Sequence, residues 1–162
     1  MNHLTDAEKA LAQQYPSEFR KALIDGLTAV YATKANFTPE ERADGGPGNA
    51  FQHAYWNALM SESIGPDLAE KFATAHENYG PGWVPDADNK MDLYNNQAGR
   101  DLAASYNPWT GGNLINHVMN ALIVKLNAVP VRREFVHYGR NGVVESVDPR
   151  MISPGAGNNS EK

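Results

Sequence analysis

Residues 48–60 read GNAFQHAYWNALM, a stretch that predicts a helix with an unusually polar side. Asn49, His53 and Asn57 follow one another at four-residue steps, and Trp56 stands next to the last of them. Side chains four residues apart lie on one helical face, so the three polar groups face the same neighbour. The pattern predicts a helix over about 48–63 that carries either an active site or a polar core.

Two further helices are predicted after it, and both carry chemically active side chains. The stretch PDLAEKFATAHEN ends in His76 and Glu77. The stretch NKMDLYNNQAGRDLAASY has polar residues at successive four-residue steps, with one more amide beside them: Asp92, Asn96 and Arg100, with Asn95 alongside. Three consecutive helices therefore each present a polar face, and we expect His53, His76 and Asp92 to converge.

The rest of the chain predicts a mainly α fold of about six helices with a small C-terminal β-hairpin. Thr5 and Glu8 form a capping-box pattern before a first helix, and Thr38, Pro39 and Glu41 repeat this start signal. In the segment between them, one helical face carries Phe19, Leu23, Leu27 and Val30, with Ile24 and Tyr31 beside it.

Near the other end, Ile115, Val118, Leu122 and Leu126 form the core stripe of a late helix. Asn141-Gly142 predicts the hairpin turn. We expect a single α-helical domain over 1–152 and a disordered tail over 153–162.

Composition excludes several classes of protein. The chain has 162 residues and no cysteine, which rules out a disulfide framework, an iron–sulfur cluster and a thiolate zinc finger. The net charge is −5 and the basic residues are scattered, so nucleic-acid binding is not indicated. The sequence has no apolar run of about 20 residues, the length of a transmembrane helix. The N-terminus lacks a signal-peptide pattern, so we expect a protein that is cytoplasmic as made, with any export following a non-classical or contact-dependent route.

The convergent polar residues fit a metal-dependent site. Two imidazoles and a carboxylate are a common minimal ligand set for zinc or a related transition metal, so His53, His76 and Asp92 are the candidate ligands. These residues and Glu77 are also the candidate acid–base groups, with Glu77 activating water. Substrate or ligand-orienting roles fall to the neighbouring polar and aromatic residues: Asn49, Trp56, Asn57, Asn95, Asn96 and Arg100. We expect a divalent metal, zinc or calcium, as cofactor.

The same residues carry a resemblance. NAFQHAYWNALM, AHE and MDLYNNQAGR resemble a bacterial domain of unknown function whose members carry N-A-x-x-H-A-x-W-N, A-H-E and M-D-x-x-N-N-x-x-G-R in this order, over about residues 46–103. That domain occurs in secreted or toxin-like proteins. The resemblance implies a secretion-system carrier or a cognate immunity protein as partner, and it implies no particular activity.

Three functions are compatible with this pattern. The first is a secreted effector or toxin-type hydrolase that acts on a phosphate-containing or cell-envelope substrate, such as a phospholipid or a cell-wall precursor. Arg100 favours phosphate, which a guanidinium binds through two parallel hydrogen bonds. The second is a non-enzymatic module whose polar core binds a partner or small ligand. The third is a purely structural polar core, in which each buried polar group is paired.

Overall fold

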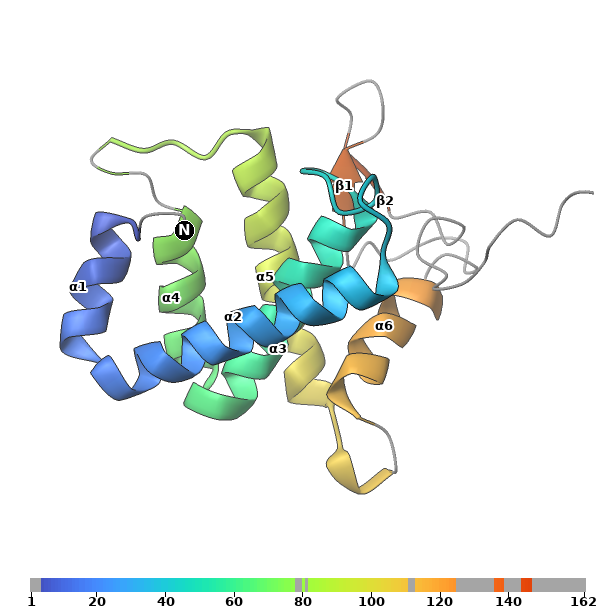
Figure 1. Cartoon of the computed structure of the whole chain (residues 1–162), viewed down its shortest axis with the longest axis horizontal. Coiled ribbons are helices and arrows are strands. Elements are labelled where there is room, and N and C mark those ends of the chain that lie inside the picture. Colours follow the sequence, from blue (N-terminus) through green and yellow to red (C-terminus); the bar gives the residue numbers. More distant parts are fainter. Residues whose placement is uncertain are drawn as a thin grey trace, which may run out of the picture.

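The computed structural model of the chain is mainly α-helical (Figure 1). It describes residues 4–77, 80, 82–110, 113–124, 136–138 and 144–146. The helices in this part of the chain are α1 (Asp6–Gln14), α2 (Pro16–Asn36), α3 (Pro47–Ile64), α4 (Pro66–Glu77), α5 (Ala87–Ser105), the short 3-10 helix η1 (Pro108–Thr110) and α6 (Leu114–Val124). Two short strands, β1 (Val136–Tyr138) and β2 (Val144–Ser146), pair antiparallel.

Local signals explain where most helices begin. Thr5 accepts a hydrogen bond from the Glu8 amide, and Glu8 reaches back to the Thr5 amide, which confirms the predicted capping box of α1. Asp86 and Asn89 form a second box at the start of α5. Three helices begin with proline, at Pro16, Pro47 and Pro66, where a fixed φ and a missing N–H are compatible with the first turn.

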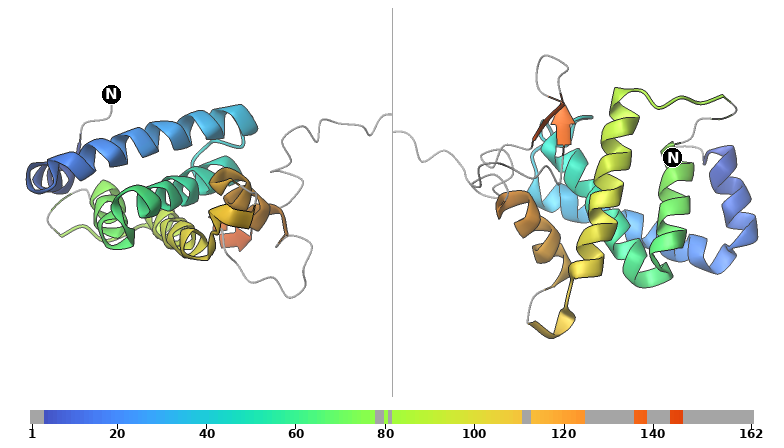
Figure 2. Two further views of the ribbon diagram at one scale, coloured as in Figure 1. Left: turned by 90° about the horizontal axis from the view of Figure 1, so that it is seen from below. Right: turned by 180° about the vertical axis from the view of Figure 1, so that it is seen from behind.

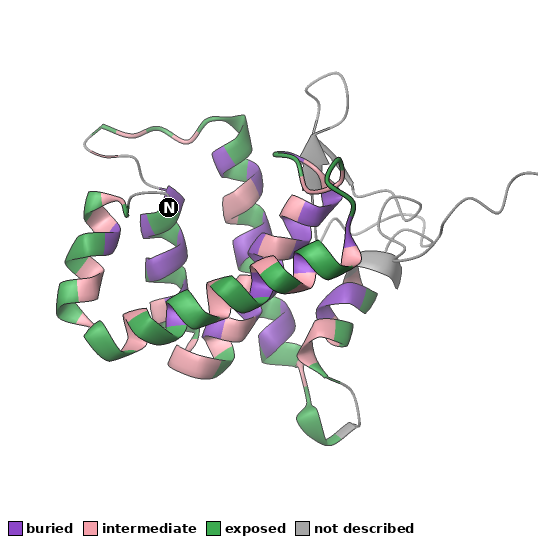
Figure 3. Ribbon diagram, in the orientation of Figure 1, coloured by how far each residue is buried: buried purple, intermediate pink, exposed green. Residues whose placement is uncertain are grey.

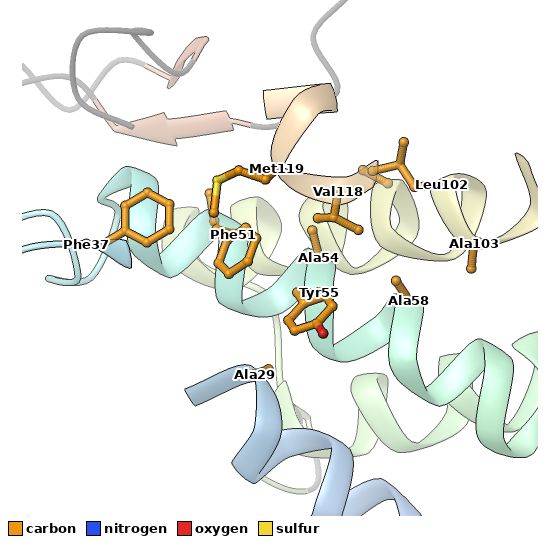
Figure 4. Close-up of a cluster of buried hydrophobic side chains, with 12 residues drawn as sticks. Ala29, Phe37, Phe51, Ala54, Tyr55, Ala58, Leu102, Ala103, Val118 and Met119 are labelled. Atoms are coloured by element: carbon orange, nitrogen blue, oxygen red, sulfur yellow. The ribbon is translucent and has the colours of Figure 1, made fainter. Parts of the chain in front are cut away.

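The helix α3 is the centre of the fold. It packs against α2, α4, α5 and α6, and its buried face is lined by Ala50, Ala54 and Ala58, none of which is exposed. On one side, Val118 and Met119 of α6 lie over this helix (Figure 4). On another side α5 approaches so closely that a Cβ on Gly99 would overlap the backbone of Ala54. Small residues therefore allow α3 and α5 to pack backbone against backbone.

The helix α2 lies on one side of α3, α4 and α5 (Figures 1 and 2). It buries small side chains, Ala22, Ala29 and Thr33, whereas much of the predicted apolar face is exposed (Figure 3). Leu23, Ile24, Leu27 and Tyr31 are all exposed large hydrophobic residues. The reason is the tight packing on α3, because alanine-sized side chains fit at this contact and the larger residues turn outward.

One other prediction differs from the structure, and several lie outside the described residues. Thr38 and Glu41 make reciprocal cap contacts, but residues 39–45 form turns and no helix, because Gly45 and Gly46 follow before one can extend. The Asn141-Gly142 turn, Leu126 and the tail 153–162 are outside the described residues, as are the side chains of Leu122 and of both strands. In the part of the chain that is described, none of the helices is both long and apolar enough to cross a membrane.

Candidate metal centre

His53, Glu77 and Asp92 come together from three consecutive helices, α3, α4 and α5. One ligand atom of each lies within 4.8 Å of the corresponding atoms of the other two. His53 Nε2 is 3.4 Å from Asp92 Oδ1, and His53 Nδ1 is 3.5 Å from Glu77 Oε1. These two distances involve different nitrogens of the ring, but the 4.8 Å limit holds for a single nitrogen and two carboxylate oxygens, which are a donor set that could hold a metal ion.

Two of these oxygens lack the partners that buried polar atoms normally have. Glu77 Oε1 and Asp92 Oδ1 are buried, and neither makes a hydrogen bond to any described residue. Leaving such an acceptor unsatisfied costs about 1–3 kcal/mol, more for charged groups. A divalent cation is a partner that satisfies both oxygens and the imidazole at once, so the residues present fit a metal.

The pKa values of the three residues also favour a bound cation. Burial, together with the nearby His76, lowers the pKa of His53 to about 4, so the ring stays neutral and can act as a ligand. Burial raises the pKa of Glu77. Burial and the negative charge of Glu77 raise the pKa of Asp92 to about 8. Two carboxyl groups that resist ionisation side by side are stabilised as anions when a cation lies between them.

His76, which the sequence predicted as the second imidazole ligand, has a different partner. Its Nδ1 is 2.9 Å from Glu8 Oε1 on α1, and its ring contacts the edge of Trp56. The hydrogen bond that His76 donates to Glu8 raises the pKa of His76, so this residue belongs to an ion pair between α1 and α4. The group brought together therefore contains Glu77 in place of His76.

Three of the predicted orienting residues form a hydrogen-bond network behind His53. Arg100 donates to Asn57, Asn57 donates to Asn96, and the Asn96 side-chain oxygen faces His53 Nδ1 at 3.2 Å. Asn57 and Asn96 are almost completely buried, and Arg100 is half-buried. These amides contact the candidate ligand directly, which is the arrangement typical of residues that orient a metal-binding histidine.

The remaining predicted residues have other surroundings. Asn49 is half-buried one turn before His53, and its buried Oδ1 makes no hydrogen bond to a described residue. Trp56 donates its indole N–H to the Ala22 carbonyl of α2 at 3.0 Å, so it joins two helices. Asn95 is fully buried on α5.

Sequence reasoning missed two residues that matter to the site. Glu8 fixes His76, and Asn89 hydrogen-bonds to Glu77, which partly offsets the rise that burial causes in the pKa of Glu77. The only sequence signal for either was its place in a capping box, which says nothing of a contact to a distant helix.

The fold and this cluster define an all-α domain with a buried histidine–carboxylate centre. The chain belongs to the family described as Domain of unknown function (DUF6973), whose model matches residues 9–125. This match spans α3, α4 and α5, and so includes every residue of the centre. The comparisons matched no curated protein and no solved structure to the chain.

Proposed function

We propose that this protein is a metal-dependent hydrolase whose metal is held by His53, Glu77 and Asp92. The observation that carries the proposal is the convergence of these three donors around two buried carboxylate oxygens that have no hydrogen-bond partner among the described residues. In a purely structural polar core, buried hydrogen-bond acceptors are normally paired with donors, and these two oxygens are not. A cation-binding role accounts for the arrangement.

The donor set favours zinc or a related transition metal over calcium. Calcium takes six to eight oxygen ligands, whereas zinc accepts imidazole nitrogen together with carboxylate oxygen in a small coordination shell. His53 supplies the nitrogen, and each carboxylate supplies one oxygen. Three protein ligands leave a coordination position for water or substrate, as in catalytic zinc sites.

The chain's own residues then have distinct roles. A divalent metal held at the centre supplies the Lewis acidity that ester hydrolysis needs at neutral pH. Asp92 is the most accessible of the three ligands, with 14 % of its side chain exposed against 10 % for His53 and 4 % for Glu77. Substrate therefore approaches from the Asp92 side. Glu77, which the sequence suggested as the base, lies among the ligands, so its role in this proposal is to hold the metal.

The proposed substrate class is a phosphate-containing or cell-envelope molecule. Its support is Arg100, a half-buried cation on α5 connected to His53 through two amides. Burial lowers the pKa of Arg100, yet a guanidinium stays charged near neutrality, which suits it to an anionic group. The secreted-effector context, with an immunity protein or secretion carrier as partner, is supported by the motif resemblance.

Metal binding is the first test. We would purify the protein without a His-tag, strip it with chelator, and titrate Zn²⁺ and Ca²⁺ by calorimetry. One Zn²⁺ should bind per chain, more tightly than Ca²⁺. Asp92→Asn, which keeps the shape but removes the charge, should weaken zinc binding at least about tenfold, because the lost ligand is one of three. Asp88→Asn, an exposed position one turn earlier on α5, is the matched control and should change zinc affinity far less, because its charge acts on Asp92 without supplying a ligand.

Hydrolysis is the second test. The zinc-loaded protein would be assayed on bis(p-nitrophenyl) phosphate and on phosphatidylglycerol vesicles, beside Asp92→Asn and Asp88→Asn. We expect turnover that is lost only in the first variant. Zinc affinity that is equal in all three proteins would refute the metal centre.

One observation favours a second candidate, a non-enzymatic binding module. His53 and Glu77 are nearly inaccessible, with 8 % and 3 % of each residue exposed, and a closed centre suits a metal or ligand that is held and never turned over. In that case Zn²⁺ binds with the same dependence on Asp92, but neither substrate is hydrolysed. The two assays together therefore separate the enzyme from the module.

A further inference from the structure

The network behind His53 begins at Arg100, a residue that can only donate hydrogen bonds. Its Nη1 is 2.9 Å from the side-chain oxygen of Asn57, and its Nη2 is 2.6 Å from the side-chain oxygen of Gln97. A guanidinium has five N–H donors and no acceptor. Asn57 must therefore present its carbonyl oxygen to Arg100, which fixes the orientation of this amide.

The orientation of Asn57 in turn fixes that of Asn96. The Asn57 side-chain nitrogen points away from Arg100 and donates to the backbone carbonyl of His53 at 3.1 Å and to Asn96 Oδ1 at 2.6 Å. Because an NH₂ group only donates, the Asn96 atom that faces it must be the oxygen. Asn57 is not exposed at all and Asn96 is 1 % exposed, so bulk water does not compete for either amide.

Asn96 then determines which nitrogen of His53 carries the proton. Its oxygen lies 3.2 Å from His53 Nδ1 and only accepts, so the proton of the neutral ring belongs on Nδ1. The lone pair is left on Nε2, which faces Asp92 Oδ1 at 3.4 Å. Two acceptors cannot hydrogen-bond each other, so the gap between them requires a proton or a metal ion.

We propose that Arg100, Asn57 and Asn96 form an orientation relay that holds His53 as the Nδ1–H tautomer and thereby keeps Nε2 available to a metal. The use of Nε2 rests on the proposed function, whereas the tautomer does not. The three are positioning residues, since they act on the candidate metal through His53. Without the relay, the charge of Asp92 would decide the tautomer. A protonated Asp92 donates to Nε2 and favours the same Nδ1–H form, whereas an ionised Asp92 only accepts and favours the opposite form, with the proton on Nε2.

Glu77 offers a competing explanation that the experiment has to separate. Its Oε1 also faces His53 Nδ1, at 3.5 Å, and could by itself retain a proton there. If Glu77 alone were responsible, removing Arg100 would leave the tautomer unchanged. If the relay is responsible, removing Arg100 leaves Asn57 oriented by the His53 carbonyl alone, its hold on Asn96 weakens, and the proton distributes between the two nitrogens.

The test is a long-range ¹H–¹⁵N spectrum of histidine-labelled, metal-free protein in chelator, which distinguishes a protonated from an unprotonated ring nitrogen. It is recorded near pH 9, where Asp92 is ionised and cannot donate to Nε2. The parent protein should show Nδ1 protonated and Nε2 unprotonated. Arg100→Met, which keeps the aliphatic stem, should show a substantial Nε2–H fraction. Gln97→Met is the matched control, because it removes the other partner of Arg100 at an exposed position and should leave the spectrum as in the parent.

A calorimetric zinc titration of the same proteins completes the experiment. Arg100→Met should bind zinc about 10–100-fold more weakly, the usual effect of losing a residue that orients a ligand. The relay is overturned by an Nε2–H tautomer in the parent, a measurement that needs no variant, or by an Arg100→Met spectrum identical to the parent's. Should zinc bind to none of the proteins while the tautomers are as stated, the proposed function fails and the relay stands.

Discussion

Gly99 of α5 lies directly against the backbone carbonyl of Ala54 in α3, at a separation that leaves no room for a Cβ atom. This contact is adjacent to the candidate centre, because His53 precedes Ala54 and Asn96 lies one turn before Gly99. The close approach of the two helices is what brings an imidazole on one within 3.4 Å of a carboxylate on the other.

Gly99→Ala should therefore be strongly destabilising. The added methyl would overlap Ala54, so the two helices must move apart, and overpacking of this kind costs about 3 kcal/mol. For a domain of this size we expect a melting temperature lower by about 10 °C in a thermal scan. Gly26→Ala on α2 is the control, since its Cβ would meet only ordinary contacts with the Trp56 ring, and it should stabilise by about 0.5–1 kcal/mol. Equal effects of the two substitutions would contradict the close contact.

The metal-free protein should lose stability as the pH rises from 6.5 to 8. The folded state keeps a proton on Asp92 up to about pH 8, whereas the unfolded chain releases it near the ordinary value of 3.8. The folded state thus binds more protons in this range, and its stability falls with pH. At about 1.4 kcal/mol per pKa unit, the loss in the free energy of unfolding is about 2 kcal/mol. Below pH 6.5, His53 opposes this trend, because its depressed pKa favours folding as the pH rises from 4.

Denaturant unfolding at pH 6.5 and pH 8, in chelator, measures this loss. Asp92→Asn should reduce the slope but not abolish it. His76, whose pKa is raised by Glu8, contributes in the same direction above its ordinary value of 6.5. A slope unchanged by Asp92→Asn would show that this carboxyl group ionises normally in the folded protein.

Zinc should reverse the loss at pH 8. A ligand that binds only the folded state at about 100 times its Kd stabilises by about 2.7 kcal/mol. The gain should be smaller at pH 6, where protons compete for the same carboxyl groups. Differential scanning fluorimetry with and without zinc at both pH values measures this, and Asp92→Asn should gain clearly less than the parent at the same zinc concentration. A larger gain at pH 6 than at pH 8 would argue against carboxylate ligands.

Thr5→Ala should loosen α1 with little effect on the rest of the domain. The Thr5 hydroxyl caps α1 by accepting from the Glu8 amide, and it donates to the Ala75 carbonyl of α4 at 2.7 Å. Losing a cap costs about 1 kcal/mol, and losing the second bond adds a similar amount. Hydrogen exchange should be faster in α1 than in the parent. Thr28→Ala, which removes a hydroxyl bonded only to Ile24 of its own helix, should leave α1 protected.

The features that the sequence predicted correctly depend on local geometry. The Thr5–Glu8 capping box needs only four consecutive residues, and the shared face of His53 and Asn57 follows from helical periodicity. The mainly α fold follows from the same periodicity. These local signals do not depend on tertiary contacts with the rest of the chain.

The presence of Glu77, and not His76, beside His53 could not be predicted from local sequence patterns. Adjacent residues on a helix point about 100° apart, so the rotation of α4 about its axis decides which of the two faces His53. That rotation depends on Glu8, which binds His76 from a helix far away in the sequence. The outward face of α2 has a similar cause, because the tight contact of Ala22 and Ala29 outweighs the larger residues.

The backbone contact of Gly99 with Ala54 also bears on which ion fits. Helices separated by large side chains can shift by a rotamer change, but two backbones in contact cannot, so the span between His53 and Asp92 is stiff. A small ion with bonds of about 2.0–2.2 Å fits donors that are already close together. A larger one with bonds of about 2.3–2.6 Å would meet the same two donors at an angle of about 90°, which belongs to a shell of six to eight ligands that this centre does not supply. Gly99, which supplies no ligand atom, would thus select ions by the bond length that suits this fixed span.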